Sequence, residues 1–351
     1  MIKKKKKFVI CDYPNPLNYT FPNFDLGSTE KRFWQIAKTV SEFDDFEVII
    51  TGPLWLPQYL PKAKHFKERL DINNYNKFLK RFGKVDYLFA GSEYFDKKDY
   101  RKAFFAVSDK IISYVTHVYD FNKVSFDNKK SYLFCYSDEM YLRYIKQKPS
   151  KLLLFHTGVD ETPMFTANPK KYLVWLGRID FDKSPHYAIL AAQKLKIPIY
   201  ILGKPVLQPE YLKKYGNLFK SKLVKMKGLV SGVKKMRLIS NAVCGIYTCG
   251  PDFLEAGAAT LGEMMCVGIP IAGISWRGND AVCEAVNNEK LGRIFVINNK
   301  ISEDSIVNGL ATSIKDCMTL NRKTIYDIGN YRYDMNRLMR EMVFIVDNKK
   351  Y

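Results

Sequence analysis

The most informative stretch of this sequence reads Glu255-Ala-Gly-Ala-Ala-Thr-Leu-Gly-Glu263-Met-Met-Cys-Val-Gly268-Ile-Pro270, and the apolar run Ile271-Ala-Gly273 follows it. The small residues before Thr260 let a ligand approach the backbone closely. The residues after them predict a short helix, whose first-turn N–H groups have no acceptor within the helix. Such a helix start binds phosphate through these donors and the helix dipole. The stretch therefore predicts a loop, a helix and a strand with an anion site at the helix start.

The two carboxylates of this stretch flank the predicted anion site. Glu255 precedes the helix, and Glu263 lies about one turn inside it. They should therefore face different parts of one ligand and not form an acid/base pair. Because a diphosphate repels carboxylates, we expect each glutamate to bind a hydroxyl-bearing end of the ligand, such as a ribose or a sugar.

Short apolar runs alternate with longer amphipathic ones along the whole chain, which is typical of βα units with a parallel sheet. The predicted strands are residues 8–11, 46–50, 86–90, 111–115, 131–136, 151–156, 172–176, 198–202, 223–227, 242–247 and 269–274. The predicted helices are residues 27–43, 185–195, 234–240, 260–267 and, as a single last helix, 325–345. The fold class is therefore α/β.

The segment 160–170 interrupts this pattern, because it has two prolines and no periodicity. We therefore predict two Rossmann-like domains, residues 1–164 and 165–330, with a helix in 331–351 that packs back toward the first domain. The length of 351 residues suits two domains. Parallel sheets bind ligands beyond the carboxyl ends of their strands, and pockets favour domain interfaces. The expected architecture has both sheets facing a central cleft.

A second motif, Leu176-Gly-Arg178-Ile-Asp180-Phe-Asp182-Lys183, follows the first predicted strand of the second domain. An arginine at a strand end and a lysine five residues later can converge on a diphosphate, the first through fork-like bonds and the second as a point charge. The alternative is a solvated Arg178 and Lys183 that bridge Asp180 and Asp182.

Glu255 and Glu263 with seven residues between them, followed by Gly268-x-Pro270, resemble the E-x7-E signature of retaining GT-B glycosyltransferases, in particular family GT4. The resemblance implies that Glu255 contacts the donor sugar and Glu263 the ribose, and that the backbone at Ala259, Thr260 and Leu261 holds the distal phosphate. The family's E-G-F-G is replaced here by Glu255-Ala-Gly-Ala258, in the loop that the resemblance places at the donor sugar. The chain also has Glu263-Met264 where the family has Glu-Ala.

The resemblance extends to other positions. The family's G-R-x4-K-G matches at Arg178 and Lys183 with Ser184 in place of the last glycine, which implies that the two cations neutralise the leaving diphosphate without an essential metal. Gly27 resembles part of the glycine loop that faces the donor, although a capped helix explains it equally well. His117 resembles a histidine near the reacting centre, with a hydrogen-bonded loop histidine as the alternative. The implied catalytic residues are Glu255, His117, Arg178 and Lys183.

The charge of the chain predicts anionic partners. Its formal net charge is +20, and the stretch from Tyr211 to Pro251 contains nine Lys or Arg residues and no acid. Such a field favours an anionic acceptor, an anionic membrane surface or nucleic acid, for which Tyr211, Tyr215 and Phe219 could stack on bases. A Lys-rich surface that only keeps the protein soluble is the alternative.

The seven scattered cysteines have no paired spacing typical of zinc and favour a reducing compartment. The apolar run after Lys3–Lys7 is short for a signal peptide, and no run has the ~18 apolar residues of a membrane span. We therefore expect a cytoplasmic protein, with peripheral membrane attachment left open.

The predicted function is transfer of a sugar, with retention, from a UDP- or GDP-linked donor to a glycan, a lipid or a modified nucleic acid. A nucleotide-sugar epimerase or phosphorylase, and a basic binding protein on a GT-B fold, are the alternatives.

Overall fold

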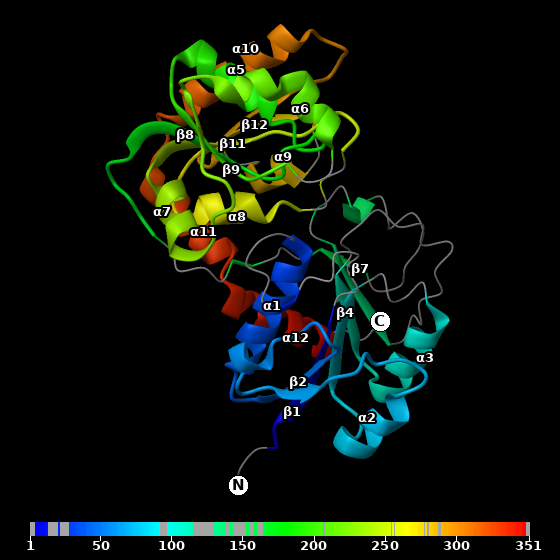
Figure 1. Cartoon of the computed structure of the whole chain (residues 1–351). Coiled ribbons are helices and arrows are strands. Elements are labelled where there is room, and N and C mark those ends of the chain that lie inside the picture. The colour runs from blue at the N-terminus through cyan, green and yellow to red at the C-terminus, as the bar shows by residue number, and fades with distance from the viewer. Residues whose placement is uncertain are drawn as a thin grey trace. The chain divides into compact units, whose positions relative to one another are not determined.

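The chain divides into two compact units, each with its own parallel sheet (Figure 1). Unit 1 comprises Met1–Asp160 and Met335–Tyr351, and unit 2 comprises Glu161–Asp334. The computed structural model describes residues 4–12, 20–21, 28–91, 97–114, 130–135, 137, 140–142, 152–154, 158–159, 164–205, 208–253, 255, 257–276, 278, 281–286 and 289–348. The predicted α/β class with parallel sheets is confirmed.

Unit 1 contains a seven-stranded sheet of order β3-β2-β1-β4-β5-β6-β7. Its strands are β1 (Lys6–Cys11), β2 (Phe46–Thr51), β3 (Lys64–Phe66), β4 (Tyr87–Gly91), β5 (Ile111–Tyr114), β6 (Ser131–Cys135) and β7 (Leu152–Leu154). Its helices include α1 (Ser28–Ser41), α2 (Tyr75–Phe82), α3 (Lys98–Val107) and α12 (Met335–Asn348). The central strands are continuous apolar runs because both faces of a parallel sheet are covered.

The predicted single helix over residues 325–345 is wrong. The structure has α11 (Arg322–Arg332) and α12, and the break lies at Tyr333, whose N–H donates to the Gly329 carbonyl as a helix cap. α11 packs on α8 (Ala259–Cys266) in unit 2, whereas α12 packs on α1 in unit 1. Apolar residues continue at helical spacing across the break, so periodicity alone could not reveal it.

Asp347 near the end of α12 ties this helix to the first sheet. Its carboxylate accepts hydrogen bonds from the Tyr87 hydroxyl at 2.7 Å, from Lys6 Nζ at 2.8 Å and from Lys110 Nζ. Burial raises the pKa of Asp347, but the hydrogen bonds from Lys110, Lys6 and Tyr87 outweigh it, and the pKa is lowered. The carboxylate therefore stabilises the folded state in its ionised form.

We expect Asp347→Asn to lower the free energy of unfolding by about 1–2 kcal/mol, because it weakens the charge-assisted hydrogen bonds to the lysines. The loss stays this small because the two lysine partners are themselves partly exposed. A lowered pKa contributes stability above the unfolded value, and this is lost as the pH falls through the folded value. The difference between wild type and variant in urea unfolding should therefore shrink on acidification to about pH 3. A difference that stays constant down to that pH would contradict the assignment.

Unit 2 contains a six-stranded sheet of order β10-β9-β8-β11-β12-β13. Its strands are β8 (Lys170–Leu176), β9 (Ile199–Leu202), β10 (Val224–Met226), β11 (Ala242–Tyr247), β12 (Ile271–Ser275) and β13 (Gly292–Val296). Its helices are α5 (Pro185–Leu195), α6 (Pro209–Tyr215), α7 (Gly232–Ser240), α8, α9 (Ala281–Val286), α10 (Glu303–Cys317) and α11. Every strand pair is parallel, so the carboxyl ends of the strands share one edge.

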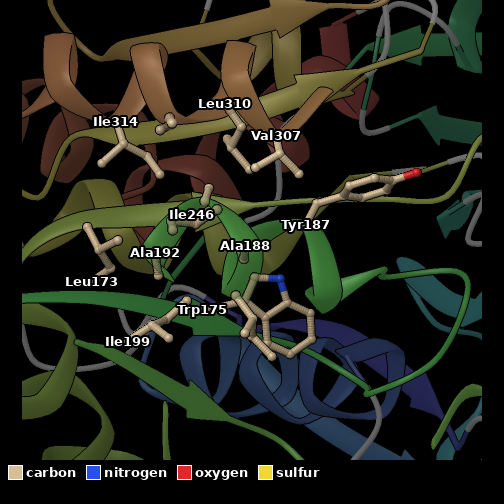
Figure 2. Packing of buried hydrophobic residues seen from close by; sticks show 14 of the residues in the cluster. Leu173, Trp175, Tyr187, Ala188, Ala192, Ile199, Ile246, Val307, Leu310 and Ile314 are labelled. Carbon is tan, nitrogen blue, oxygen red and sulfur yellow. The ribbon is translucent and has the colours of Figure 1, made fainter. Parts of the chain in front are cut away.

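The core of unit 2 lies between the sheet and two helices. Figure 2 shows Tyr187, Ala188 and Ala192 of α5 and Val307, Leu310 and Ile314 of α10 beside sheet residues such as Trp175. Trp175 is fully buried, and its indole N–H donates to the Thr248 hydroxyl at 2.9 Å. This packing fixes the strand ends that carry the candidate site.

Candidate functional site

The loop after β8 carries Arg178 at the carboxyl edge of the second sheet. Its Nε lies 3.1 Å from Asp180 Oδ2, and its Nη2 lies 2.9 Å from Asp182 Oδ2. Arg178 thus bridges Asp180 and Asp182, the interaction that was predicted as the alternative to diphosphate binding. Its side chain remains 32% exposed. A Cβ at Gly203, after β9, would lie 1.9 Å from the Gly177 carbonyl oxygen, so only glycine allows the two strand ends to approach this closely.

Asp180 is fully buried and organises the loop that leads to Lys183. Its carboxylate accepts from the Lys183 N–H at 2.9 Å, and its carbonyl accepts from the Ser184 N–H at 2.9 Å. Ser184 has φ 44° and ψ 51°, in the left-handed region. The family's glycine therefore corresponds to a position where the backbone favours glycine.

We expect the free energy of unfolding of Ser184→Gly to exceed that of Ser184→Ala by about 1 kcal/mol, because glycine has no Cβ penalty in this conformation. The two variants form a matched pair, since both remove the hydroxyl that donates to the Phe181 carbonyl at 2.6 Å. Urea unfolding of both proteins measures the difference. Equal stability of the two would show that the left-handed backbone carries no such strain.

Lys183 pairs with Glu255, 72 residues later in the chain. Two contacts hold their loops together: the Thr248 hydroxyl donates to the Lys183 carbonyl at 2.7 Å, and the Gly250 N–H donates to the Asp182 carbonyl at 2.8 Å. The predicted bridging of Asp180 and Asp182 by Lys183 is therefore not what the structure has. The lysine joins the two sequence motifs.

The surroundings of Glu255 favour its charged form. Its carboxylate accepts from the Tyr247 hydroxyl at 2.6 Å and from the Gly257 N–H at 3.3 Å. The Lys183 ammonium lies 4.3 Å from the centre of the Phe253 ring. Burial raises the pKa of Glu255, but the charge of Lys183 and the hydrogen bonds outweigh it, so the pKa is lowered. Glu255 is thus an ionised acceptor at neutral pH.

α8 begins at Ala259, one residue before the predicted start, and Ala258 caps it. An alanine cap has no side-chain acceptor for the N–H groups of the first turn. Glu263 lies one turn into the helix and is buried, and its Oε1 is 2.8 Å from Lys235 Nζ of α7. Glu255 thus pairs with Lys183, whereas Glu263 pairs with Lys235.

Gly27 and His117 lie outside the described residues. Their predicted roles therefore stay predictions. Within the described part of the chain, no three His, Cys, Asp or Glu side chains gather as metal ligands would, and no helix is long and apolar enough to cross a membrane.

The predicted base-stacking role of the aromatic residues in the basic stretch is wrong for Tyr211. Its side chain is fully buried, and its hydroxyl accepts from the His186 N–H at 2.8 Å. Tyr215 stacks on the His186 ring with centroids 3.9 Å apart, and Phe219 packs against the core. Burial lowers the pKa of His186 to about 3, so its imidazole is uncharged at neutral pH.

Sequence reasoning missed four residues that shape the site: Asp180 as its organiser, Thr248 as the link between the loops, Tyr247 on Glu255, and Lys235 on Glu263. A strand-end tyrosine and threonine directly before the Glu255 loop were a readable signal for two of them. No sequence signal distinguished Lys235 from the eight other cations of the basic stretch.

A comparison of the sequence with protein-family models found no match, and a comparison with curated proteins found none either. The structure resembles solved glycosyltransferases over nearly the whole chain. A glycosyltransferase from Rickettsia africae matches with a TM-score of 0.72, 15% identity and 98% of each chain covered. HepE from Anabaena, in complex with UDP and glucose, matches with a TM-score of 0.69, 14% identity, 98% of this chain and 100% of that one.

AviGT4, a glycosyltransferase involved in avilamycin A biosynthesis, matches with a TM-score of 0.68, 15% identity and 97% of each chain. At these identities the comparisons describe the fold. The chain has the two-sheet GT-B fold of these glycosyltransferases, which is the fold that the sequence motifs implied.

Proposed function

We propose that this protein is a retaining glycosyltransferase that transfers a hexosyl group from a nucleotide diphosphate-sugar. The contact between Lys183 and Glu255 carries the proposal, because it joins the two sequence motifs beside the start of α8. Cations, helix N–H groups and a hydroxyl-binding carboxylate are the chemistry that a nucleotide-sugar requires. The likeness of the fold to HepE, which was solved with UDP and glucose, supports UDP as the nucleotide, with GDP as the alternative.

In this proposal the donor binds at the carboxyl edge of the second sheet. Lys183 moves from Glu255 to the diphosphate and, together with Arg178, neutralises the charge that develops as the glycosidic bond breaks. Glu255 is then available to accept hydrogen bonds from sugar hydroxyls. The N–H groups at Ala259, Thr260 and Leu261 hold the distal phosphate.

We assign donor binding to residues 165–330 and acceptor binding to residues 1–164. Gly27 and His117 are proposed, from the family resemblance, to lie near the donor and the reacting centre. The acceptor is a glycan, a lipid or a modified nucleic acid, and the exposed cations of residues 213–237 suit an acceptor that carries negative charge.

The first test is a melting screen against UDP-, GDP- and other nucleotide-sugars. A ligand at 100 times its Kd stabilises the folded state by about 2.7 kcal/mol, so a true donor should raise the melting temperature by several degrees. Arg178→Ala should keep most of this shift, because Arg178 acts mainly on the charge that develops as the bond to the sugar breaks. A screen in which no nucleotide or nucleotide-sugar stabilises the wild type would contradict the proposal.

Product analysis follows with the donor that the screen selects. Incubation with the nucleotide-sugar alone should leave the sugar configuration unchanged, and transfer should require an added acceptor. Conversion of the sugar without an acceptor would indicate an epimerase. Salt-sensitive binding of nucleic acid or anionic vesicles without sugar turnover would indicate a binding protein.

A further inference from the structure

The ion pair between Lys235 of α7 and Glu263 of α8 is buried. Nζ lies 2.8 Å from Oε1, and the two side chains are only 9% and 7% exposed. The other eight cations of the basic stretch are exposed, so Lys235 is the one that its helix turns inward. Helix α7 meets α8 here, and the pair lies one turn beyond the start of α8.

Packing alone does not account for this pair. Removing two charges from water costs several kcal/mol per ion, and apolar residues of similar volume often replace a buried pair without loss of stability. A buried glutamate without its lysine would have a raised pKa and would tend to be protonated, which makes it a poorer acceptor. The positive charge of Lys235, 2.8 Å from this carboxylate, favours its ionised form.

We propose that Lys235 is a positioning residue for recognition of the nucleotide ribose. It holds Glu263 ionised and fixed, so that this carboxylate accepts hydrogen bonds from the ribose hydroxyls of a nucleoside diphosphate. The inference rests on the proposed function, in which the phosphates lie at the start of α8. One helical turn is about 5.4 Å, a distance comparable to that between a phosphate and its ribose.

The electrostatics are consistent with this role. A carboxylate has about four acceptor positions, so a bond from Lys235 is compatible with further bonds from a diol. Hydrogen bonds to an ionised acceptor are shorter and roughly twice as strong as neutral ones. A neutral residue at position 235 should therefore weaken the bonds to the ribose while leaving the phosphate contacts in place.

The test compares UDP with 2′,3′-dideoxy-UDP by isothermal titration calorimetry. The wild type should prefer UDP, and Lys235→Met should weaken UDP binding about tenfold while changing the binding of the dideoxy analogue less than twofold. Because both ligands are titrated into the same preparation, a reduced folded fraction does not affect their affinity ratio. Lys235→Arg should restore most of the preference, and Lys234→Met, at the exposed neighbouring position, should leave it unchanged.

A double variant covers the case in which Lys235→Met does not fold. Lys235→Met/Glu263→Gln contains no isolated buried charge, and its preference for UDP should equal that of Glu263→Gln alone, because Lys235 acts only through Glu263. A further loss in the double variant would overturn the proposal, as would equal weakening of both ligands in Lys235→Met. A wild type that binds both ligands equally would overturn this inference alone.

If UDP does not bind, the same comparison is made with GDP and its dideoxy form. A wild type that binds neither nucleotide, and that no nucleotide-sugar stabilises, would contradict the proposed function itself. The two failures are thus distinguishable.

Discussion

Arg178→Ala should slow turnover of the nucleotide-sugar by about 100- to 1000-fold, which is the effect of removing one preorganised group that stabilises developing charge. Arg178 is one-third exposed and already oriented by Asp180 and Asp182, so the variant should stay folded. The reduction should appear in kcat, because the charge on the diphosphate grows as the bond to the sugar breaks. Steady-state kinetics with the donor selected in the melting screen measure it.

Lys183→Met should lose turnover to a similar extent, but removal of the lysine leaves Glu255 as an isolated buried charge. The variant Lys183→Met/Glu255→Gln therefore accompanies Lys183→Met, and circular dichroism confirms that both are folded. Lys225→Ala, at an exposed position of β10, is the control and should turn over normally. Near-normal turnover in both Arg178→Ala and Lys183→Met would contradict the proposed mechanism.

Arg322→Ala should lower the free energy of unfolding by about 4 kcal/mol, since the guanidinium donates to three carbonyls and each charge-assisted bond contributes about 1.5–3 kcal/mol before relaxation. The carbonyls are those of Thr166 at 3.2 Å, Ala242 at 2.6 Å and Ser240 at 2.6 Å. Burial lowers the pKa of Arg322 to about 10, which still leaves it charged at neutral pH.

The neighbouring Lys323 provides the control for this measurement. Lys323 pairs with Asp327 on the exposed side of α11, and Lys323→Ala should cost less than about 0.5 kcal/mol. Urea unfolding of both variants gives the comparison. A loss below about 1 kcal/mol in Arg322→Ala would mean that water replaces the guanidinium at these carbonyls.

Much of the second sheet could be predicted because its strands are short apolar runs. The predicted bounds of α5 and β11 match the structure, and those of β8, β9 and β12 differ by one or two residues. Helix α10 was not identified, although Ile306, Leu310 and Ile314 recur at helical spacing on its buried face. The separation of α11 from α12 was not predictable from periodicity, because it depends on which unit each helix packs against.

The sequence predicted which residues form the candidate site, but it did not predict which of them contact one another. The motifs identified Arg178, Lys183, Glu255 and Glu263, but local spacing suggested that Lys183 would meet the nearby aspartates. Its contact with Glu255 depends on Thr248 and Gly250, which bring two distant loops together. The pairing of Glu263 with Lys235 likewise depends on how α7 packs on α8, and no sequence spacing encodes it.

Because unit 1 is built from both ends of the described chain, its folding cannot be complete until α12 has left the ribosome. Lys6, Tyr87 and Lys110 are synthesised long before Asp347, their shared partner, and unit 2 is translated between them. At about 5–20 residues per second the delay is on the order of ten seconds or longer. Nascent unit 1 would therefore expose during that interval the surface that α12 covers, and transiently exposed surface of this kind favours aggregation.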